Sequence, residues 1–547
     1  ATTSQYGVYT SALITANNIT VTGTASTAVA GWVVQVNAMT INSGSTGGDI
    51  TITATGAAAG GGNGLYQSGA ITGANGSDIS FTSNNIISQN GAITLAANTS
   101  GNTATLTYDT TSGNKNSTIT SGALTLTAGS SSDINFVMKS AGSAINPGAI
   151  GSSSVRLPGT VTLDNTYQSG GSTGFITTSN LATYTNSAVG VTVNNAIYST
   201  KLISITGAAY GSQGISYTAV INASAGGVGL TGLTYNNYGV YTSNASLITA
   251  NYITINGYAT TTVSGWIVQA GALTINSAAT GGDIAITATG AAAGGGNGLY
   301  QSGAISAANG SDITFTSNNT INQAGAITLA ANTTATSRIF YDNTTGNKTS
   351  SVTGAAITLT SGSTQDVNYT MLAAGGNLQV AGAVAVNGVV NLDNTYGCTG
   401  TGCTPASGYI TAANYSGLAT TTHAVQTTSG ALSGVKGVTI NAISYGNYGL
   451  YSNQAISSST GNIVVAGVSY GNRGISQDGT TTASAGNVTL TGATTSQYGV
   501  YTSALITANN ITVTGTASTT VAGWVVQVNA MTINSGSTGG DITITAT

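Results

Sequence analysis

The sequence predicts an all-β protein built as a parallel β-helix, a β-solenoid in which short strands of successive coils stack on one another. Three observations predict it: a composition that disfavours helices, short alternating apolar runs, and repeats at several length scales. Only 4% of the 547 residues are charged, none is Glu, and 78 are Gly. Because helix surfaces normally carry Glu, Lys, Arg and Gln, this composition favours strands and turns.

Alternating runs mark the strands. They join Ile, Val or Leu with Thr, Ser or Ala in NITVTG (18–23), DITITATG (49–56), DISFTS (78–83), AITLAAN (92–98) and ALTLTAG (123–129). Period-two alternation with β-branched residues predicts strands with one buried face. Gly, Asn, Asp and Ser clusters between these runs predict turns. The outward Thr pairs also leave open a flat ice-binding surface, although alternation alone places Thr outward.

Long repeats divide the chain. Residues 1–55 return at 493–547 with one change, Ala28 against Thr520, and the segment from Asn236 retraces that from Ser4 more loosely. We therefore expect one repeat unit at 1–232, a longer copy at 233–492, and the start of the next repeat at 493–547. A chain that begins and ends inside a repeat is expected to be a slice of something longer.

A finer step of 25 residues separates Tyr448-Gly-Leu-Tyr, Arg473-Gly-Ile-Ser and Tyr498-Gly-Val-Tyr. Repeats of 20–30 residues built from short strands are typical of a β-helix. Such a coil contacts only its neighbours, so one whole coil can be inserted, and the second unit is indeed 28 residues longer. At 25 residues a coil, the chain would hold about 22 coils.

The segments GNVTLTG (486–492), ALTINSAATGGDIAITATG (272–290) and GAITLAAN (91–98) resemble the repeats of filamentous-haemagglutinin-type adhesins, which are β-helical proteins of bacteria with an outer membrane. The resemblance implies a right-handed parallel β-helix, and export through an outer-membrane secretion partner or an autotransporter barrel. It also implies a secreted, cell-surface protein with a role in adhesion or matrix building. The family's N-terminal secretion cap has no counterpart among these residues.

Composition narrows the function classes. A net charge of −4, with scattered Lys and Arg, gives no electrostatic footprint for nucleic acid. No apolar run of about 18 residues predicts a membrane helix. We therefore expect an extracellular structural and adhesive fibre that associates with itself. The alternative is a discrete adhesin that binds a glycan or receptor through an exposed face, and a polysaccharide-active enzyme or an ice-binding protein is a weaker alternative.

Cys398 and Cys403 occur together in GCTGTGC and are both missing from the matching loop of the first unit. Joint presence favours a small disulfide loop in an oxidising compartment. Free thiols or a metal site are the alternatives. The chain offers only one His, His423, as a further soft ligand. No metal or other cofactor is predicted.

Acidic residues precede many strands, at Asp49, Asp78, Asp133, Asp283, Asp312, Asp366 and Asp541. Calcium between the turns is one interpretation. An Asx-type turn is favoured, because calcium needs six to eight oxygens and these carboxylates arrive singly. Asp164 and Asp393 in LDNTY are the best isolated catalytic candidates, but glycoside hydrolysis needs two carboxylates. We assign no catalytic residue, and expect His423 to lie on an exposed turn.

Tyrosine is abundant, with 26 residues against 5 Phe and 3 Trp. Eight tyrosines recur in the motif Y-G-[VL]-Y and are candidates for surface contact with glycans or neighbouring filaments: Tyr6, Tyr9, Tyr238, Tyr241, Tyr448, Tyr451, Tyr498 and Tyr501. Outward rings would offer an apolar face and a hydroxyl. A place in the core, or beneath a neighbouring loop, is the equally favoured alternative. The three Trp residues, each in GW[VI]VQ, are expected to pack.

Overall fold

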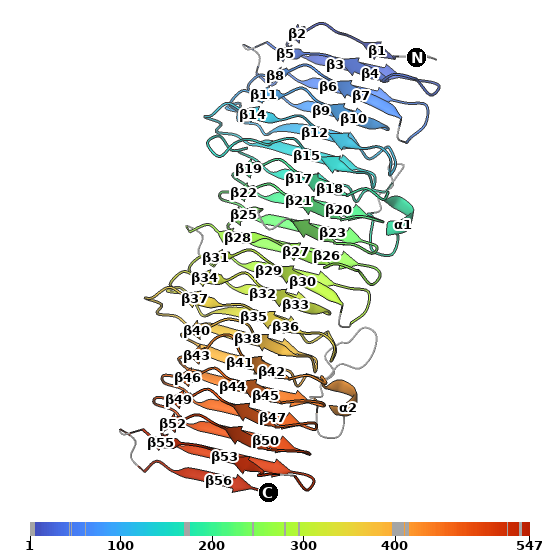
Figure 1. Cartoon of the computed structure of the whole chain (residues 1–547). Helices are drawn as coiled ribbons and strands as arrows, with labels where there is room; N and C mark the ends of the chain where they lie inside the picture. The colour runs from blue at the N-terminus through green and yellow to red at the C-terminus, as the bar shows by residue number, and fades with distance from the viewer. Residues whose placement is uncertain are drawn as a thin grey trace. The chain divides into compact units, whose positions relative to one another are not determined.

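The computed structural model describes residues 6–42, 44, 46–60, 62–168, 175–242, 246–277, 281–293, 296–396, 410, 415–521, 523–534, 536 and 539–547 (Figure 1). It confirms the predicted fold class, an all-β parallel β-solenoid with about 19 turns of roughly 26 residues. The expected 22 coils are too many, because several turns are longer than 25 residues. Contacts divide the chain into two compact units, unit 1 (Ala1–Asn276) and unit 2 (Ser277–Thr547), whose boundary differs from the repeat boundaries expected from sequence.

Each turn contributes up to three short strands, one to each of three parallel sheets named I, II and III in chain order. In unit 1, sheet I contains β1 (Val8–Tyr9), β4 (Val34–Val36), β7 (Asn63–Gln67), β10 (Ile86–Gln89), β13 (Ile119–Thr120), β16 (Ile145–Asn146), β18 (Val191–Val193), β21 (Ile215–Tyr217), β24 (Val240–Thr242) and β27 (Val268–Ala270). Sheet II contains β2 (Ile14–Ala16), β5 (Met39–Ile41), β8 (Ile71–Gly73), β11 (Ile93–Leu95), β14 (Leu124–Leu126), β19 (Ile197–Ser199), β22 (Ile221–Ala223), β25 (Leu247–Ala250) and β28 (Ala272–Ile275). Sheet III contains β3 (Ile19–Thr24), β6 (Ile50–Thr55), β9 (Ile79–Ser83), β12 (Ala104–Thr110), β15 (Ile134–Ser140), β17 (Val161–Asp164), β20 (Ile203–Ala209), β23 (Val228–Thr234) and β26 (Ile253–Ala259).

Unit 2 follows the same plan. Its sheet I contains β30 (Asn297–Gln301), β33 (Thr320–Gln323), β36 (Val352–Gly354), β39 (Leu378–Val380), β42 (Val425–Thr427), β45 (Leu450–Ser452), β48 (Ile475–Gln477), β51 (Val500–Thr502) and β54 (Val526–Gln527). Sheet II contains β31 (Ile305–Ala307), β34 (Ile327–Leu329), β37 (Ile357–Leu359), β40 (Val384–Val386), β43 (Leu432–Gly434), β46 (Ile456–Ser458), β49 (Thr481–Ala483), β52 (Ile506–Ala508) and β55 (Met531–Ile533). Sheet III contains β29 (Ile284–Thr289), β32 (Ile313–Ser317), β35 (Ser337–Asn343), β38 (Val367–Ala373), β41 (Val389–Asp393), β44 (Gly437–Ser444), β47 (Ile463–Ser469), β50 (Val488–Thr494), β53 (Ile511–Ala517) and β56 (Ile542–Ala546).

The turns vary in length in the same order in both units. In unit 1, sheet I pairs Leu65 with Ile87, Ile87 with Ile119 and Ile145 with Val191. In unit 2 it pairs Leu299 with Ile321, Ile321 with Val352 and Leu378 with Val425. The longest turn of each unit holds the short helix of that unit, α1 (Leu181–Tyr184) or α2 (Tyr415–Leu418). Loop length therefore changes outside the sheets, and the strands stay in register.

Unit 2 has one more regular turn after its longest turn. Unit 1 runs from Val191 through Ile215 to Val240, whereas unit 2 runs from Val425 through Leu450 and Ile475 to Val500. Each of these unit 2 steps is 25 residues, as the motif spacing predicts. Because each turn pairs only with its neighbours, the extra turn leaves the register of the other turns unchanged.

The interior is formed by the alternate residues of every strand. In β20 and β47, for example, residues alternate between buried and partly exposed along most of the strand. Inward tyrosines carry their hydroxyls into polar rows: the Tyr108 hydroxyl donates to Gln89 Oε1 at 2.9 Å, and Tyr341 donates to Gln323 Oε1 at 2.8 Å. Burial raises the pKa of Tyr217, another inward ring, to about 12. These buried hydroxyls therefore stay protonated and act as donors.

Glycine in the Y-G-V-Y motif allows two segments of the backbone to meet. A Cβ on Gly232 of β23 would collide with the carbonyl oxygen of Gly239, and Gly492 of β50 has the same relation to Gly499. Sheet III thus approaches the turn before sheet I too closely for any side chain. The recurring Gly is a packing requirement at this corner.

The short helices cover part of the outer face of sheet III. In unit 1, Ile176 and Leu181 pack against Ala208 of β20 and Leu233 of β23, and α1 is drawn beside these strands (Figure 1). In unit 2, Ile410 and Ala419 pack against Ile443 of β44. Within the described part of the chain, no helix is long and apolar enough to span a bilayer.

Candidate functional site

The eight motif tyrosines lie on or just before sheet I. In the complete turns, the residue between Gly and the second Tyr points inward, and Val240, Leu450 and Val500 are buried. The second Tyr of each motif therefore faces outward, and the first lies on the turn before the strand. The two rings of each motif touch, with centroids between 4.9 and 5.5 Å apart in the pairs Tyr6–Tyr9, Tyr238–Tyr241, Tyr448–Tyr451 and Tyr498–Tyr501.

In unit 2 these pairs join into a row that we call the aromatic column: His423, Tyr448, Tyr451, Arg473, Tyr498 and Tyr501. The strands set it in place, because sheet I pairs Tyr451 with Ser476 and Ser476 with Tyr501. The His423 ring stacks on Tyr448 at 5.0 Å and on Tyr451 at 5.1 Å, each at an interplanar angle of 24°. Three successive turns thus contribute rings to one continuous stack.

Arg473 continues the stack across the turn that lacks a tyrosine. Its guanidinium carbon lies 4.0 Å from the ring centroid of Tyr501, 5.0 Å from Tyr498 and 5.9 Å from Tyr448. A guanidinium over a tyrosine face is attracted by the ring quadrupole. Arg473 Nη1 also donates to Ser476 Oγ at 3.1 Å.

The charge of Arg473 has no carboxylate partner among the described residues. Other cations do have one: Lys201 pairs with Asp133 at 2.6 Å, and Lys436 pairs with Asp366 at 2.7 Å. Arg473 is partly buried, so its charge is less screened than that of a fully exposed side chain. The column can therefore offer one guanidinium and a row of hydroxyl-bearing rings to an outside partner.

His423 does not lie on an exposed turn, as the sequence suggested. It is partly buried, its Nδ1 is enclosed without a hydrogen-bond partner, and burial lowers the pKa of its imidazole. Stacking on Tyr448 and Tyr451 explains the difference. That partner set could be found only from the 25-residue step, which places His423 one turn before Tyr448.

The matching place in unit 1 lacks both charged groups. Gln213 stands where Arg473 stands, in the same Gly-Ile-Ser context, and it accepts a hydrogen bond from Ser212 Oγ at 3.1 Å. The Tyr238–Tyr241 pair follows it, as Tyr498–Tyr501 follows Arg473. The Arg473 site is therefore specific to unit 2 within the described chain.

Aspartates before strands act between turns. The Asp78 backbone N–H donates to Asp49 Oδ1 at 3.1 Å, and the Thr105 N–H donates to Asp78 Oδ1 at 2.6 Å. In unit 2, the Asp312 N–H donates to Asp283 Oδ1 at 2.9 Å. The expected Asx turn within one coil is wrong for these residues, because the carboxylate accepts from the next turn. No three His, Cys, Asp or Glu side chains in the described residues come together as a metal site.

The candidate Asp164 has neighbours that sequence spacing did not reveal. Sheet III pairs Asp109 with Lys139 and Lys139 with Asp164, so the ammonium stands between two carboxylates on three successive turns. Burial raises the pKa of Asp164, while Lys139 and the hydrogen bonds from Thr166 oppose the shift. In unit 2, Leu372 stands in the place of Lys139, beside Asp393. The two LDNTY aspartates therefore have different surroundings.

Both LDNTY carboxylates accept two bonds from the Thr two residues on. Asp164 Oδ1 accepts from the Thr166 N–H and hydroxyl at 2.8 and 2.6 Å, and Asp393 Oδ1 accepts the same pair from Thr395. These bonds shape the start of the longest turn in each unit. Cys398 and Cys403 lie outside the described residues, so the disulfide stays a prediction.

Comparison with known proteins adds no family. No family model matches the chain, and no curated protein matches it. The resemblance to filamentous-haemagglutinin-type repeats therefore remains an expectation from sequence.

Proposed function

We propose that this chain is a segment of an extracellular structural fibre with an adhesive surface. The observation that carries the proposal is the interchangeability of its turns. Unit 2 contains a complete extra 25-residue turn, Val425 to Leu450 to Ile475 to Val500, and the pairing on either side stays in register. A fold that extends by adding turns suits a protein that must span distance.

The outer surface supports lateral association. Charged residues make up only 4% of the chain, so little electrostatic repulsion would keep parallel copies apart. Outward positions carry mainly Thr, Ser and Asn, together with the tyrosine pairs of sheet I. The expected partners are further copies of the chain, and a bacterial outer membrane with its secretion partner is the expected location from the sequence resemblance.

Lengthening the chain tests the structural proposal. Five extra copies of residues 450–474 inserted after residue 474 should lengthen the folded particle by about 24 Å, at about 4.8 Å a turn. Electron microscopy of single particles measures this length. A scrambled insert of the same composition is the control. A particle that keeps its length, or that forms a compact second body, would contradict the proposal.

A second candidate function, a discrete adhesin, is supported by the aromatic column. Its unpaired Arg473 lies among hydroxyl-bearing rings on an outward face. Binding to immobilised glycans or whole cells should then saturate and should fall with Arg473→Gln, which copies Gln213 of unit 1. Gln213→Arg is the matched control, because it adds a cation without removing the column.

A further inference from the structure

A pocket opens on the outer face of sheet III in unit 2. Its volume is about 250 Å³, and its lining is mainly apolar. The lining includes Ile443, Val468, Ala493 and Thr516, with Tyr470 and Thr495 at the corner toward sheet I. No acidic or basic side chain lines it.

The floor of the pocket is one ladder of outward residues. Sheet III pairs Ile443 with Val468, Val468 with Ala493, and Ala493 with Thr516. The side chains shrink along this ladder, from two branched aliphatic residues to Ala and Thr. The pocket exists because the later turns of the ladder contribute too little volume to fill the space beside the earlier ones.

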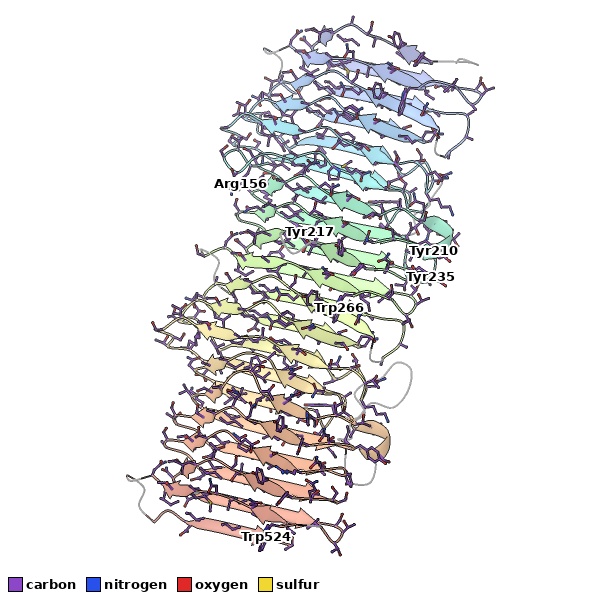
Figure 2. All side chains as sticks on the ribbon, in the orientation of Figure 1. Arg156, Tyr210, Tyr217, Tyr235, Trp266 and Trp524 are labelled. Atoms are coloured by element: carbon purple, nitrogen blue, oxygen red, sulfur yellow. The ribbon has the colours of Figure 1, made fainter. Side chains whose placement is uncertain are left out.

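The same ladder in unit 1 is filled. Sheet III there pairs Ala208 with Leu233 and Leu233 with Tyr258. Leu233 is buried, and the rings of Tyr235 and Tyr258 pack against the cluster it shares with Ala208. Tyr235 also stacks on Tyr210 with ring centroids 4.6 Å apart, and Figure 2 shows the two rings together at the edge that carries α1.

The repeat aligns these positions one by one. LTYNNYGVY (233–241) matches ATTSQYGVY (493–501), and NYITINGYA (251–259) matches NNITVTGTA (509–517). Leu233, Tyr235 and Tyr258 therefore correspond to Ala493, Thr495 and Thr516. Unit 2 has lost one isobutyl group and two phenol rings from a surface that unit 1 fills with its own side chains.

We propose that this pocket of unit 2 binds a small, uncharged, planar aromatic molecule of one or two rings. The shape argument comes from unit 1, where phenol rings occupy the equivalent space. An apolar cavity of about 150 Å³ already holds a benzene ring, so the pocket has room for the ligand. Thr495 and Thr516 can exchange hydrogen bonds with a phenolic hydroxyl at its rim. The lining offers no counter-ion, which disfavours charged ligands.

A protein partner fits less well. A stable protein interface buries about 800 Å² on each side, and an opening of this size accepts only a small group. The proposal goes beyond the fibre function and does not depend on it, since a fibre without this pocket would extend in the same way.

Binding of 4-fluorophenol, followed by fluorine NMR of the ligand, tests the proposal directly. The whole chain should bind the ring saturably. The double variant Ala493→Leu/Thr516→Tyr should weaken binding at least tenfold, because it installs the residues that unit 1 uses at these positions. Cyclohexanol and 4-fluorobenzoate are the control ligands, and both should bind more weakly than 4-fluorophenol.

A reciprocal variant guards against a general effect on the fold. Leu233→Ala/Tyr258→Thr should open the unit 1 ladder and add a second site for 4-fluorophenol. Absence of binding to the unaltered chain would overturn the proposal. So would unchanged binding to Ala493→Leu/Thr516→Tyr when circular dichroism shows that this variant is folded.

Discussion

The two units share an interior and differ on their outer faces. Inside, the same Tyr-to-Gln hydrogen bond recurs at Tyr108 in unit 1 and at Tyr341 in unit 2. Outside, Gln213 faces solvent where unit 2 has Arg473, and Tyr258 fills a place that Thr516 leaves open. An inward residue must match both neighbouring turns at close packing, whereas an outward residue is less constrained. Copying therefore preserves the core, and function can diverge on the surface.

The corner glycines give the strictest test of what the units share, and the largest expected effect. Gly232→Ala in unit 1 and Gly492→Ala in unit 2 should each destabilise their unit by about 1–3 kcal/mol, because the added methyl group meets a backbone carbonyl that has no room to move. Hydrogen exchange measured by mass spectrometry would show faster exchange in the turns around each site.

Gly229→Ala is the matched control for this prediction. Gly229 lies on the same strand as Gly232, and a Cβ there would meet nothing within 4 Å. It should leave exchange unchanged or slow it slightly, since Ala lowers the entropy of the unfolded chain. Equal effects at Gly229 and Gly232 would contradict the close approach of the backbone at this corner.

The buried hydroxyls test whether the two interiors are energetically alike. Tyr108→Phe and Tyr341→Phe each remove one hydrogen bond to a glutamine that still accepts a backbone N–H, from Gly122 or from Ala355. Each should cost about 1 kcal/mol, because the remaining acceptor bond keeps the glutamine satisfied. Calorimetric melting of the two variants should give similar shifts. A large difference between them would show that the shared geometry hides unequal packing.

Sequence alone could predict the interior but not the surface sites. Alternation in NITVTG and its relatives identified strands and their buried faces, and the 25-residue step identified the regular turns. Turn lengths were harder, because the 46 residues between Ile145 and Val191 contain a loop and a helix with no alternation. The count of coils was therefore too high.

Neighbours across turns were the main loss. Lys139 stands 30 residues from Asp109 and 25 from Asp164, and only the register of sheet III brings the three together. The pocket is further from view, since it arises from side chains that are missing relative to unit 1. The aromatic column was half visible: its tyrosines form a motif, whereas Arg473 and His423 join it only through stacking.

Arg473→Gln would make the unit 2 column resemble unit 1. It should destabilise the surrounding turns by about 0.5–1 kcal/mol, because the guanidinium loses its contacts with three tyrosine rings while the turn itself is kept. Local hydrogen exchange at β45, β48 and β51 measures the loss. Gln213→Arg in unit 1, followed at β21 and β24, shows whether a guanidinium stabilises the simpler site. No change in unit 2 would mean that Arg473 is held there without net gain.

Acid should weaken unit 2 through His423, an effect that unit 1 cannot show because it has no His. Burial lowers the pKa of His423, so the unfolded chain binds this proton more readily than the folded chain. The stability contributed by the neutral ring is present above the ordinary His value of about 6.5 and is lost as the pH falls through that value toward the lowered folded pKa. The ring is only partly buried, so we expect a loss of a few tenths of a kcal/mol. Hydrogen exchange of β42 and β45, corrected for intrinsic rates, should accelerate between pH 7.5 and 5.5, and His423→Gln should remove that dependence. Persistence of the acid effect in His423→Gln would assign it to another group of unit 2.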